Sequence, residues 1–366
     1  PFDPAVRNEF LQRLATCGNF LDSTDDNSEA ILQRSICLER LNEFISVSEN
    51  FKHYVAPGIE EVVRMINSNL FSHRALRTAG KGRDISGENV YLYAVYDFFI
   101  NIIYHEDMNK RLLVYIFTPE FIEECLKLFD SEDSSERMHL KVLFHYVHAK
   151  CVYKRKFIRE AMFNRLLTKI HETQCYTGVD ELLELQAQLI SHCSMPLKEA
   201  LEVLYRKVMI PLLQPEEMWT YGEQLIRCLG FYTVKCRYLN LEMFEALARH
   251  WPLSNRPKLV IFLDAIYCIE DCDIEEVRPS FPKLLAKIAL SVETLADEEV
   301  VLKFLKLLDN DYFFTLVKQL KHATVPLVSS LLKGLISKSS LVHLGAKLQT
   351  ILHTLEAMLV QTEFVN

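Results

Sequence analysis

Residues that favour helix starts recur in the second half of this chain at a nearly constant spacing. Pro196, Pro282 and Pro326 each follow a Ser or Thr N-cap candidate by two residues, and Asn240 is a further N-cap candidate. The interval is 44 residues from Pro196 to Asn240, 42 from Asn240 to Pro282 and 44 from Pro282 to Pro326. Two helices per period of about 40–47 residues are typical of HEAT or armadillo repeats.

Each of these intervals has room for two amphipathic helices. Apolar residues recur at helical spacing over 283–295, and a second helix fits at 215–234, 258–268 or 297–308. We therefore expect an all-α, HEAT/armadillo-like α-solenoid of about eight helical-hairpin repeats, with a concave face lined by one helix of each pair. The whole chain, 1–366, is predicted to form a single repeat domain.

The N-terminal third is less regular. Asp133, with Glu136 three residues later, predicts a capping box at the start of a helix. Residues 72–88 are basic and contain three glycines, and we expect them to form the longest loop of the array.

Composition limits the classes of function. Glycine is scarce, at 10 residues, which disfavours sheets with tight hairpins, and the net charge of −8 argues against general nucleic-acid binding. The most apolar stretch, 90–104, is interrupted by Asp97 and is too short to span a membrane. Ten cysteines without paired spacing and no secretory leader predict a reducing compartment. We expect a cytoplasmic location, with the nucleus as an additional candidate location. Because the sequence begins at Pro1, we expect natural termini beyond it.

No pattern of catalytic or cofactor-binding residues stands out. The chain lacks a Gly-rich phosphate loop, a Gly-x-Ser-x-Gly elbow and a His-Glu-x-x-His helix. Cys268 and Cys272 could share a helix face, His145 and His148 lie three apart on one predicted helix, and either pair could ligate a metal. No second Cys or His pair follows the cysteines at zinc spacing, so half-buried cysteines are the simpler interpretation. For the histidines, a peptide-binding surface or simple solvation is favoured. We predict no enzyme activity, no metal and no cofactor.

The densest group of positive charges in this acidic chain follows Ala149. It is either a solvated helix face or a site for an acidic or phosphorylated peptide, for which arginine offers a matched fork of donors. The residues alone do not choose between these. Its members are Lys150, Lys154, Arg155, Lys156 and Arg159.

Several short strings, in order and over roughly residues 9–332, resemble the B-prime family of protein phosphatase 2A regulatory subunits. Each string alone is ordinary helical sequence, and the set together is specific to that family. The strings occupy residues 95–99, 128–137, 178–184, 195–199, 251–252, 256–258, 262–263 and 309–312.

The resemblance implies an adaptor, not an enzyme. It implies a non-catalytic, substrate-targeting subunit that binds the phosphatase scaffold and catalytic subunits. It also implies that the concave face recruits substrates or adaptor proteins through Leu-x-x-Ile-x-Glu motifs, which are often phosphorylated. A HEAT-type scaffold that no longer associates with the phosphatase is the alternative.

The family's peptide-binding residues can be carried over by position, and only some are retained. Matching residues are His145, Arg155 and Lys198, which would face the acidic part of the peptide, and Leu185 and Leu189, which stand where the family has isoleucines.

Three positions of this predicted site depart from the family. Tyr146 replaces an arginine, His148 a tyrosine and Leu201 a histidine. Loss of the arginine removes a charge-assisted hydrogen bond of about 1.5–3 kcal/mol, roughly ten- to hundred-fold in affinity. The resemblance therefore implies weaker binding of the family motif, or preference for a related one.

Overall fold

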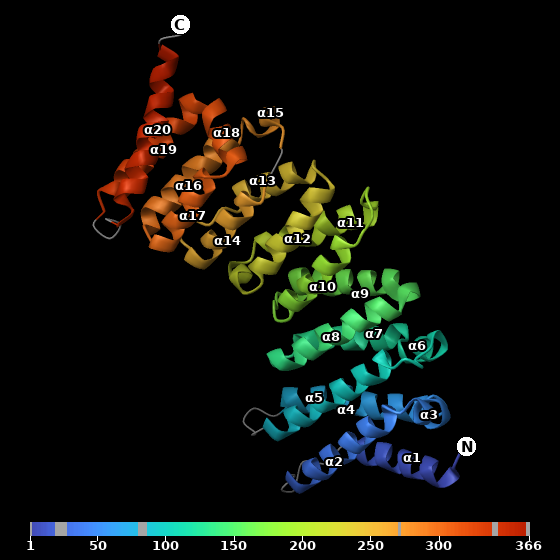
Figure 1. Cartoon of the computed structure of the whole chain (residues 1–366). Helices are drawn as coiled ribbons and strands as arrows, with labels where there is room; N and C mark the ends of the chain where they lie inside the picture. Colours follow the sequence, from blue (N-terminus) through green and yellow to red (C-terminus); the bar gives the residue numbers. More distant parts are fainter. Residues whose placement is uncertain (1, 19–27, 80–85, 270–271, 339–342, 364–366) are drawn as a thin grey trace. The chain divides into compact units, whose positions relative to one another are not determined.

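The computed structural model describes residues 2–18, 28–79, 86–269, 272–338 and 343–363, which form helices joined by turns and short loops, without a strand among them (Figure 1). The all-α prediction is thus confirmed. Contacts divide the chain into two compact units. Unit 1 comprises residues 1–168 and 177–185, and unit 2 comprises 169–176 and 186–366.

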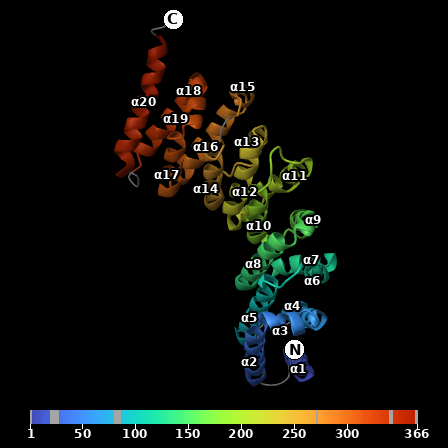
Figure 2. The ribbon, with the colours of Figure 1, turned by 45° about the vertical axis from the view of Figure 1, so that its right-hand side comes forward.

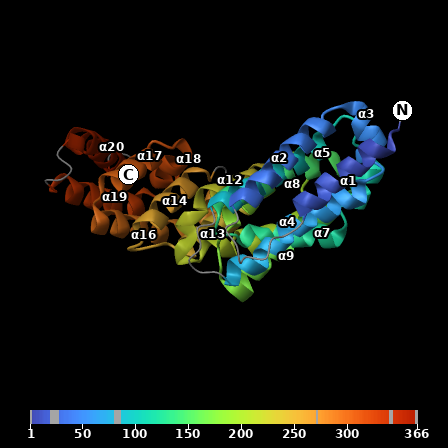
Figure 3. The same cartoon turned by 90° about the horizontal axis from the view of Figure 1, so that it is seen from below.

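Unit 1 is built from two layers of helices. In one layer α2 packs on α5 and α5 on α8; in the other α1 packs on α4 and α7 on α9 (Figures 2 and 3). Consecutive helices thus alternate between layers, as in a helical-hairpin array. The elements are α1 (Pro4–Gly18), α2 (Ser28–Ile45), α3 (Ser48–Asn50), η1 (Phe51–Val55), α4 (Ile59–Ala79), α5 (Ser86–Tyr104), α6 (Lys110–Ile116), α7 (Pro119–Lys127), η2 (Leu128–Asp130), α8 (Ser134–Lys150), η3 (Val152–Lys154), α9 (Arg155–Thr168) and the first half of α10 (Val179–Ser191).

Side chains of the N-cap residues fix where several of these helices begin. The Asp133 carboxylate accepts from the backbone N–H of Ser135 at 2.9 Å, and the Thr118 hydroxyl accepts from that of Phe121 at 3.2 Å. Both bonds satisfy donors that a helix start otherwise leaves free. The predicted start at Asp133 is confirmed. Glu136, its predicted partner in a capping box, is buried and accepts a hydrogen bond from the Tyr96 hydroxyl.

Unit 2 has a similar arrangement up to its last helix: α12 packs on α14 and α14 on α17, while α16 packs on α19. The consecutive helices α19 and α20 pack directly on each other. The elements are η4 (Lys169–Thr173), the second half of α10, α11 (Glu199–Leu204), η5 (Tyr205–Met209), η6 (Pro211–Leu213), η7 (Glu216–Thr220), α12 (Gly222–Lys235), α13 (Leu239–Arg249), α14 (Arg256–Tyr267), α15 (Ile274–Val277), α16 (Phe281–Leu295), α17 (Glu298–Leu308), α18 (Asp311–Gln319), α19 (Lys321–Ile336) and α20 (Gly345–Glu363).

Three predicted helix starts in this half are wrong. The helix expected after Ser194 begins later, at Glu199, with Lys198 at its N-cap. Asn240 is the second residue of α13 and is buried, not its cap. Helix α19 begins at Lys321 and contains Pro326. Thr324 lies inside this helix, and its hydroxyl donates to the Val317 carbonyl oxygen at 2.7 Å and does not cap a helix. The predicted start at Ser280 is confirmed in position, and its hydroxyl donates to Val277.

The long loop predicted at 72–88 is also wrong at both of its ends. Residues 72–79 are the last two turns of α4, and residues 86–88 open α5. Arg and Ala, which are strong helix formers, occupy half of 72–79, and the helix runs on to Ala79, just before Gly80. Residues 80–85, with Lys81 and Arg83, lie outside the described part of the chain.

A close backbone contact in unit 1 requires glycine at position 178. Gly178 has a φ of +75°, and a Cβ added there would lie 1.9 Å from the carbonyl oxygen of Phe129. Glycine adopts this conformation freely, whereas an L-residue is strained in it. Gly178 thereby lets the start of α10 approach the end of η2.

We expect Gly178→Ala to lower the free energy of unfolding by more than about 1 kcal/mol, because the new methyl group adds a clash to an unfavourable φ. Urea denaturation of the two proteins measures the change. Gly230→Ala is the control: it lies inside α12 with nothing within 4 Å of its Cβ position, so it should be neutral or stabilising. Equal effects of the two substitutions would contradict the prediction.

Candidate functional site

The predicted peptide-binding residues are divided between the two units. His145, Tyr146 and His148 lie in the last two turns of α8, Arg155 is the first residue of α9, and Leu185 lies in the first half of α10; all belong to unit 1. Leu189, Lys198 and Leu201 belong to unit 2. The placement of the two groups relative to each other stays a prediction.

In unit 1 the chain turns tightly from α8 into α9 and brings Arg155 back to the end of α8. The Arg155 Nε–H donates to the carbonyl oxygen of His148 at 2.9 Å. The positive guanidinium is favourable at the negative C-terminal end of a helix. Arg155 has no ion pair within the described residues, so its terminal NH₂ groups can still donate to an anion. The arrangement presents an arginine whose position is already fixed.

Tyr146 is part of an aromatic group that the sequence did not predict. Its ring meets that of Tyr104, at the end of α5, edge to face at a centroid distance of 5.6 Å, and lies 5.9 Å from that of His145. The Lys150 Nζ lies 5.7 Å from the centre of the Tyr104 ring. Tyr104 was missed because its neighbours come from α8, more than 40 positions later in the chain, and only the packing of α5 on α8 joins them.

The three leucines of the predicted site expose little surface. Leu185 is 5% exposed, Leu189 8% and Leu201 8%. Leu185 and Leu189 are one turn apart on α10, on one face of that helix, as predicted. Most of each side chain contributes to the core of its unit, so a peptide would touch only their outer edges.

Helix α10 is attached to α8 within unit 1 by two ion pairs. The Arg137 Nε is 2.7 Å from the Glu181 Oε1, and the Lys141 Nζ is 2.6 Å from the Glu184 Oε2. All four side chains are less than a quarter exposed, so water screens these pairs less than it screens surface ones. The pairs hold the helix of Leu185 against the helix of His145.

The basic run does not form one cluster. Lys156 is 83% exposed in its side chain and lies 3.8 Å from Glu160, which fits a solvated helix face. Lys154 lies over the Phe157 ring. The pKa of Glu120 is lowered by hydrogen bonds of its carboxylate to its own backbone and Thr118, and then by the charge of Lys154. Lys150 instead lies over the Tyr104 ring of α5, and Arg155 donates to the end of α8.

Lys198, in unit 2, is exposed at the N-cap of α11. It has no ion pair among the described residues. An exposed ammonium group can meet an acidic ligand with little desolvation, and we keep Lys198 as a candidate on that basis.

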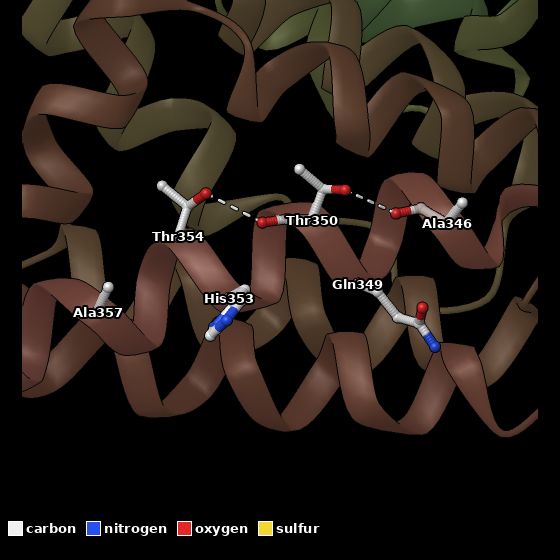
Figure 4. Close-up of a pocket in the computed structure, with 6 residues that line it drawn as sticks. All are labelled: Ala346, Gln349, Thr350, His353, Thr354 and Ala357. Atoms are coloured by element: carbon white, nitrogen blue, oxygen red, sulfur yellow. Dashed lines mark hydrogen bonds between the residues drawn. The ribbon is translucent and has the colours of Figure 1, made fainter.

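Two shallow grooves lie in unit 2. One, of about 540 Å³, is lined by α14 and α17, where Arg256 pairs with Asp297 at 2.9 Å and with Glu299 at 2.7 Å. The other, of about 600 Å³, lies on α20 (Figure 4). There the Thr350 and Thr354 hydroxyls donate to carbonyl oxygens of their own helix, each at 2.9 Å. The charged side chains of the first groove are thus largely paired within the protein, and in the second groove the two threonine hydroxyls are bonded to their own helix.

Neither metal-ligand pair considered from the sequence is part of a larger group. In the described ranges no three His, Cys, Asp or Glu side chains converge as a metal site would require. The ten cysteines, all in the described ranges, are thiols and form no disulfide. Cys268 follows the last residue of α14 and is exposed, whereas Cys272 precedes α15 and is buried, so the two do not share a helix face. Among the described helices, none combines the length and apolarity needed to cross a bilayer.

The family model and the relatives found by comparison with known proteins all point to one family. The family model described as protein phosphatase 2A regulatory B subunit (B56 family) matches residues 1–362. The chain is 28% identical over 338 residues to the B′ kappa isoform of the 57 kDa phosphatase 2A regulatory subunit from Arabidopsis thaliana, covering 89% of this chain and 67% of that one. The B′ eta isoform of the same plant is 27% identical, covering 88% and 65%. The delta isoform of the 56 kDa regulatory subunit from Saccharomyces cerevisiae is 30% identical, covering 91% and 45%. The chain thus spans about two thirds of the plant relatives and less than half of the yeast one.

The ion pair between α8 and α10 yields a stability prediction. We expect Glu181→Gln to lower the free energy of unfolding by about 1.5–3 kcal/mol, because it leaves the half-buried Arg137 without its anionic acceptor. Glu160→Gln removes the same charge from an exposed pair and should change stability by less than about 0.5 kcal/mol. Urea denaturation measures both, and similar shifts would mean that the buried pair contributes no more than a surface one.

Proposed function

The chain belongs to the B56 family of protein phosphatase 2A regulatory B subunits, and we propose that it binds the scaffold and catalytic subunits of that phosphatase and recruits substrates to them. The members of the family that it matches are named as regulatory subunits, so the prediction of a protein without catalytic activity of its own is confirmed. Holding a substrate next to the catalytic subunit raises its local concentration there without new chemistry.

We infer that substrates are held through short peptides of the Leu-x-x-Ile-x-Glu type. The observation that supports this most directly is Arg155, which is fixed at the end of α8 by its bond to the His148 carbonyl oxygen and has donors left over. An arginine held in one geometry loses less entropy when it binds a carboxylate or phosphate. In unit 1 the outer edge of Leu185 would add an apolar contact. Leu189 and Lys198, in unit 2, remain candidates from the resemblance alone.

A second function is favoured by one specific feature of the site. Tyr146 stands where the resemblance places an arginine, and its ring is in contact with Tyr104 instead of offering a charge. A chain with this change could serve as a HEAT-type scaffold for other proteins without the phosphatase. The two functions differ in whether the chain associates with the phosphatase core, so measuring that association distinguishes them.

We expect the chain to form a stable heterotrimer with the scaffold and catalytic subunits. Size-exclusion chromatography of the mixed, purified proteins measures it, and the three chains should elute together ahead of the core dimer. Elution of the chain separately from an intact core dimer would leave the second function as the conclusion.

We expect Arg155→Glu to weaken binding of a Leu-x-x-Ile-x-Glu peptide at least about tenfold, because one charge-assisted hydrogen bond is lost and a like charge is added. Fluorescence polarisation with a labelled peptide measures the affinity. Lys156→Glu makes the same kind of charge reversal at the next residue, on an exposed side chain, and is the matched control.

Comparison of the two variants tests whether Arg155 belongs to the peptide-binding site. Binding by Lys156→Glu should stay within about twofold of the parent, since only long-range screened charge changes. Unchanged binding by Arg155→Glu would remove Arg155 from the peptide site. Circular dichroism shows whether each variant keeps its helices.

A further inference from the structure

Four lysines of unit 2 donate to backbone carbonyl oxygens that lie about one repeat earlier in the chain. The lysine and the residue that accepts its bond are 39 to 45 positions apart. Among the described residues, none of the four lysines is in an ion pair. The bonds run from the Lys235 Nζ to the oxygen of Cys193 at 2.6 Å, from Lys258 to Gln214 at 2.8 Å, from Lys287 to Ala248 at 2.7 Å and from Lys338 to Glu293 at 2.5 Å.

Three of the accepting oxygens lie at the C-terminal end of an α-helix. Ala248 and Glu293 are in the last turns of α13 and α16, and Cys193 lies two residues beyond the last residue of α10. The last carbonyl groups of a helix have no partner within it and carry a partial negative charge. A lysine ammonium group supplies both a donor and a positive charge there. We call these three bonds, made by Lys235, Lys287 and Lys338, the lysine caps.

At the end of α10 the lysine cap completes a series of bonds. The Cys193 backbone N–H donates to the Ile190 carbonyl oxygen at 3.0 Å, and the Cys193 thiol donates to that of Leu189 at 3.1 Å. The carbonyl oxygen of Cys193 in turn accepts the bond from Lys235, the last residue of α12. Cys193 therefore connects the last turn of α10 to the next repeat.

This end of α10 is where unit 2 carries its candidate peptide-binding residues. Leu189 lies in the last turn of α10, and Lys198 follows Cys193 by five residues, at the N-cap of α11. Lys235 is not itself one of the candidates. The position of the Leu189 side chain and the start of the segment that leads to Lys198 both depend on how α10 ends.

We propose that Lys235 is a positioning residue of the peptide site, which holds the end of α10 in place from the next repeat. This inference rests on the proposed peptide-binding function, because Leu189 and Lys198 were singled out as parts of that site. Lys235 acts through the Cys193 backbone and makes no contact with the peptide. Without its donor, the Cys193 carbonyl group loses its partner and the last turn of α10 frays.

The surroundings of the bond make its loss costly. Lys235 is half-buried, and its bond to Cys193 lies in a partly buried place. Water replaces a missing donor less readily there than on an open surface, and hydrogen bonds from charged donors are among the stronger ones.

A second lysine cap supplies the matched control. Lys287 is also half-buried and donates in the same way to Ala248 in the last turn of α13, which carries none of the candidate residues. A methionine at either position keeps an unbranched, apolar side chain and removes the charge and all three donors. An arginine at position 235 keeps a positive charge and donors.

The test measures binding of a labelled Leu-x-x-Ile-x-Glu peptide to the complete chain by fluorescence polarisation. We expect Lys235→Met to weaken binding at least about fivefold, and Lys235→Arg and Lys287→Met to stay within about twofold of the parent. Both methionine variants should lower the melting temperature by about 2–5 °C, because each loses one cap. Equal weakening by the two methionine variants would mean a general loss of stability and would overturn the proposal.

Salt distinguishes a positioning role from direct contact with the peptide. A direct contact between Lys235 and an acidic peptide would be screened, so the loss in Lys235→Met would shrink between about 50 mM and 300 mM salt. A positioning role predicts the same fold loss at both concentrations. A loss that shrinks with salt, or one that Lys235→Arg does not restore, overturns the positioning role.

Hydrogen exchange tests the cap without the peptide. Amides of residues 189–194 should exchange at least about threefold faster in Lys235→Met, and those of 246–250 should do so only in Lys287→Met. Unchanged exchange at 189–194 would overturn the cap itself. If exchange rises there but the parent chain does not bind the peptide, the cap is established, and the peptide site is rejected together with the role of Lys235 in it.

Discussion

Each helix pair in this protein has apolar faces that only neighbouring pairs can bury, and the rest of the structure depends on that constraint. In unit 1, α5 lies between α2 and α8, and in unit 2, α14 lies between α12 and α17. No pair could bury its apolar surface alone, so stability is shared between neighbours along the array. The same stacking places the end of one helix beside the end of a helix in the next pair. Surface sites of this protein therefore form where equivalent positions of consecutive pairs meet.

Several side-chain hydrogen bonds join residues that lie about one repeat length apart in the sequence. The Trp251 indole donates to the Ser291 hydroxyl across 40 residues, and Arg137 bonds Glu181 across 44. Bonds of this kind join equivalent places in successive pairs and fix how one pair sits on the next. Gly178 also helps to fix how one pair sits on the next. Because it has no Cβ, the backbone carbonyl of Phe129 can lie close against it. Most of these residues lie in the strings that carry the family resemblance, so much of that resemblance reflects the requirements of stacking.

The sequence was sufficient to predict the helical repeat and the presence of the helices. It was less informative about where the helices begin and about which side chains meet at the candidate site. Asp133 acts as the predicted cap because its side chain is free to turn back on the helix start. Asn240 and Thr324 are residues of the same capping types, but both are buried, and the hydroxyl of Thr324 is bonded to Val317. Burial is decided by neighbours about 40 positions away, which local patterns do not contain. The contact between the Tyr104 and Tyr146 rings was missed for the same reason, since the two residues are far apart in the sequence.

Position 146 illustrates how a site can change while the fold that supports it stays. Tyr146, which stands where the resemblance places an arginine, is half-buried against the Tyr104 ring and so takes part in the packing of α5 on α8. Arg155 keeps its bond to the end of α8, because that bond is to a backbone oxygen and does not depend on the side chain at position 146 or 148. The position of the Arg155 cation therefore does not depend on the aromatic side chains beside it. A peptide that bound there would meet the same arginine whatever side chain stood at position 146, so its affinity for a carboxylate and its preference for the neighbouring residues would be set by different side chains.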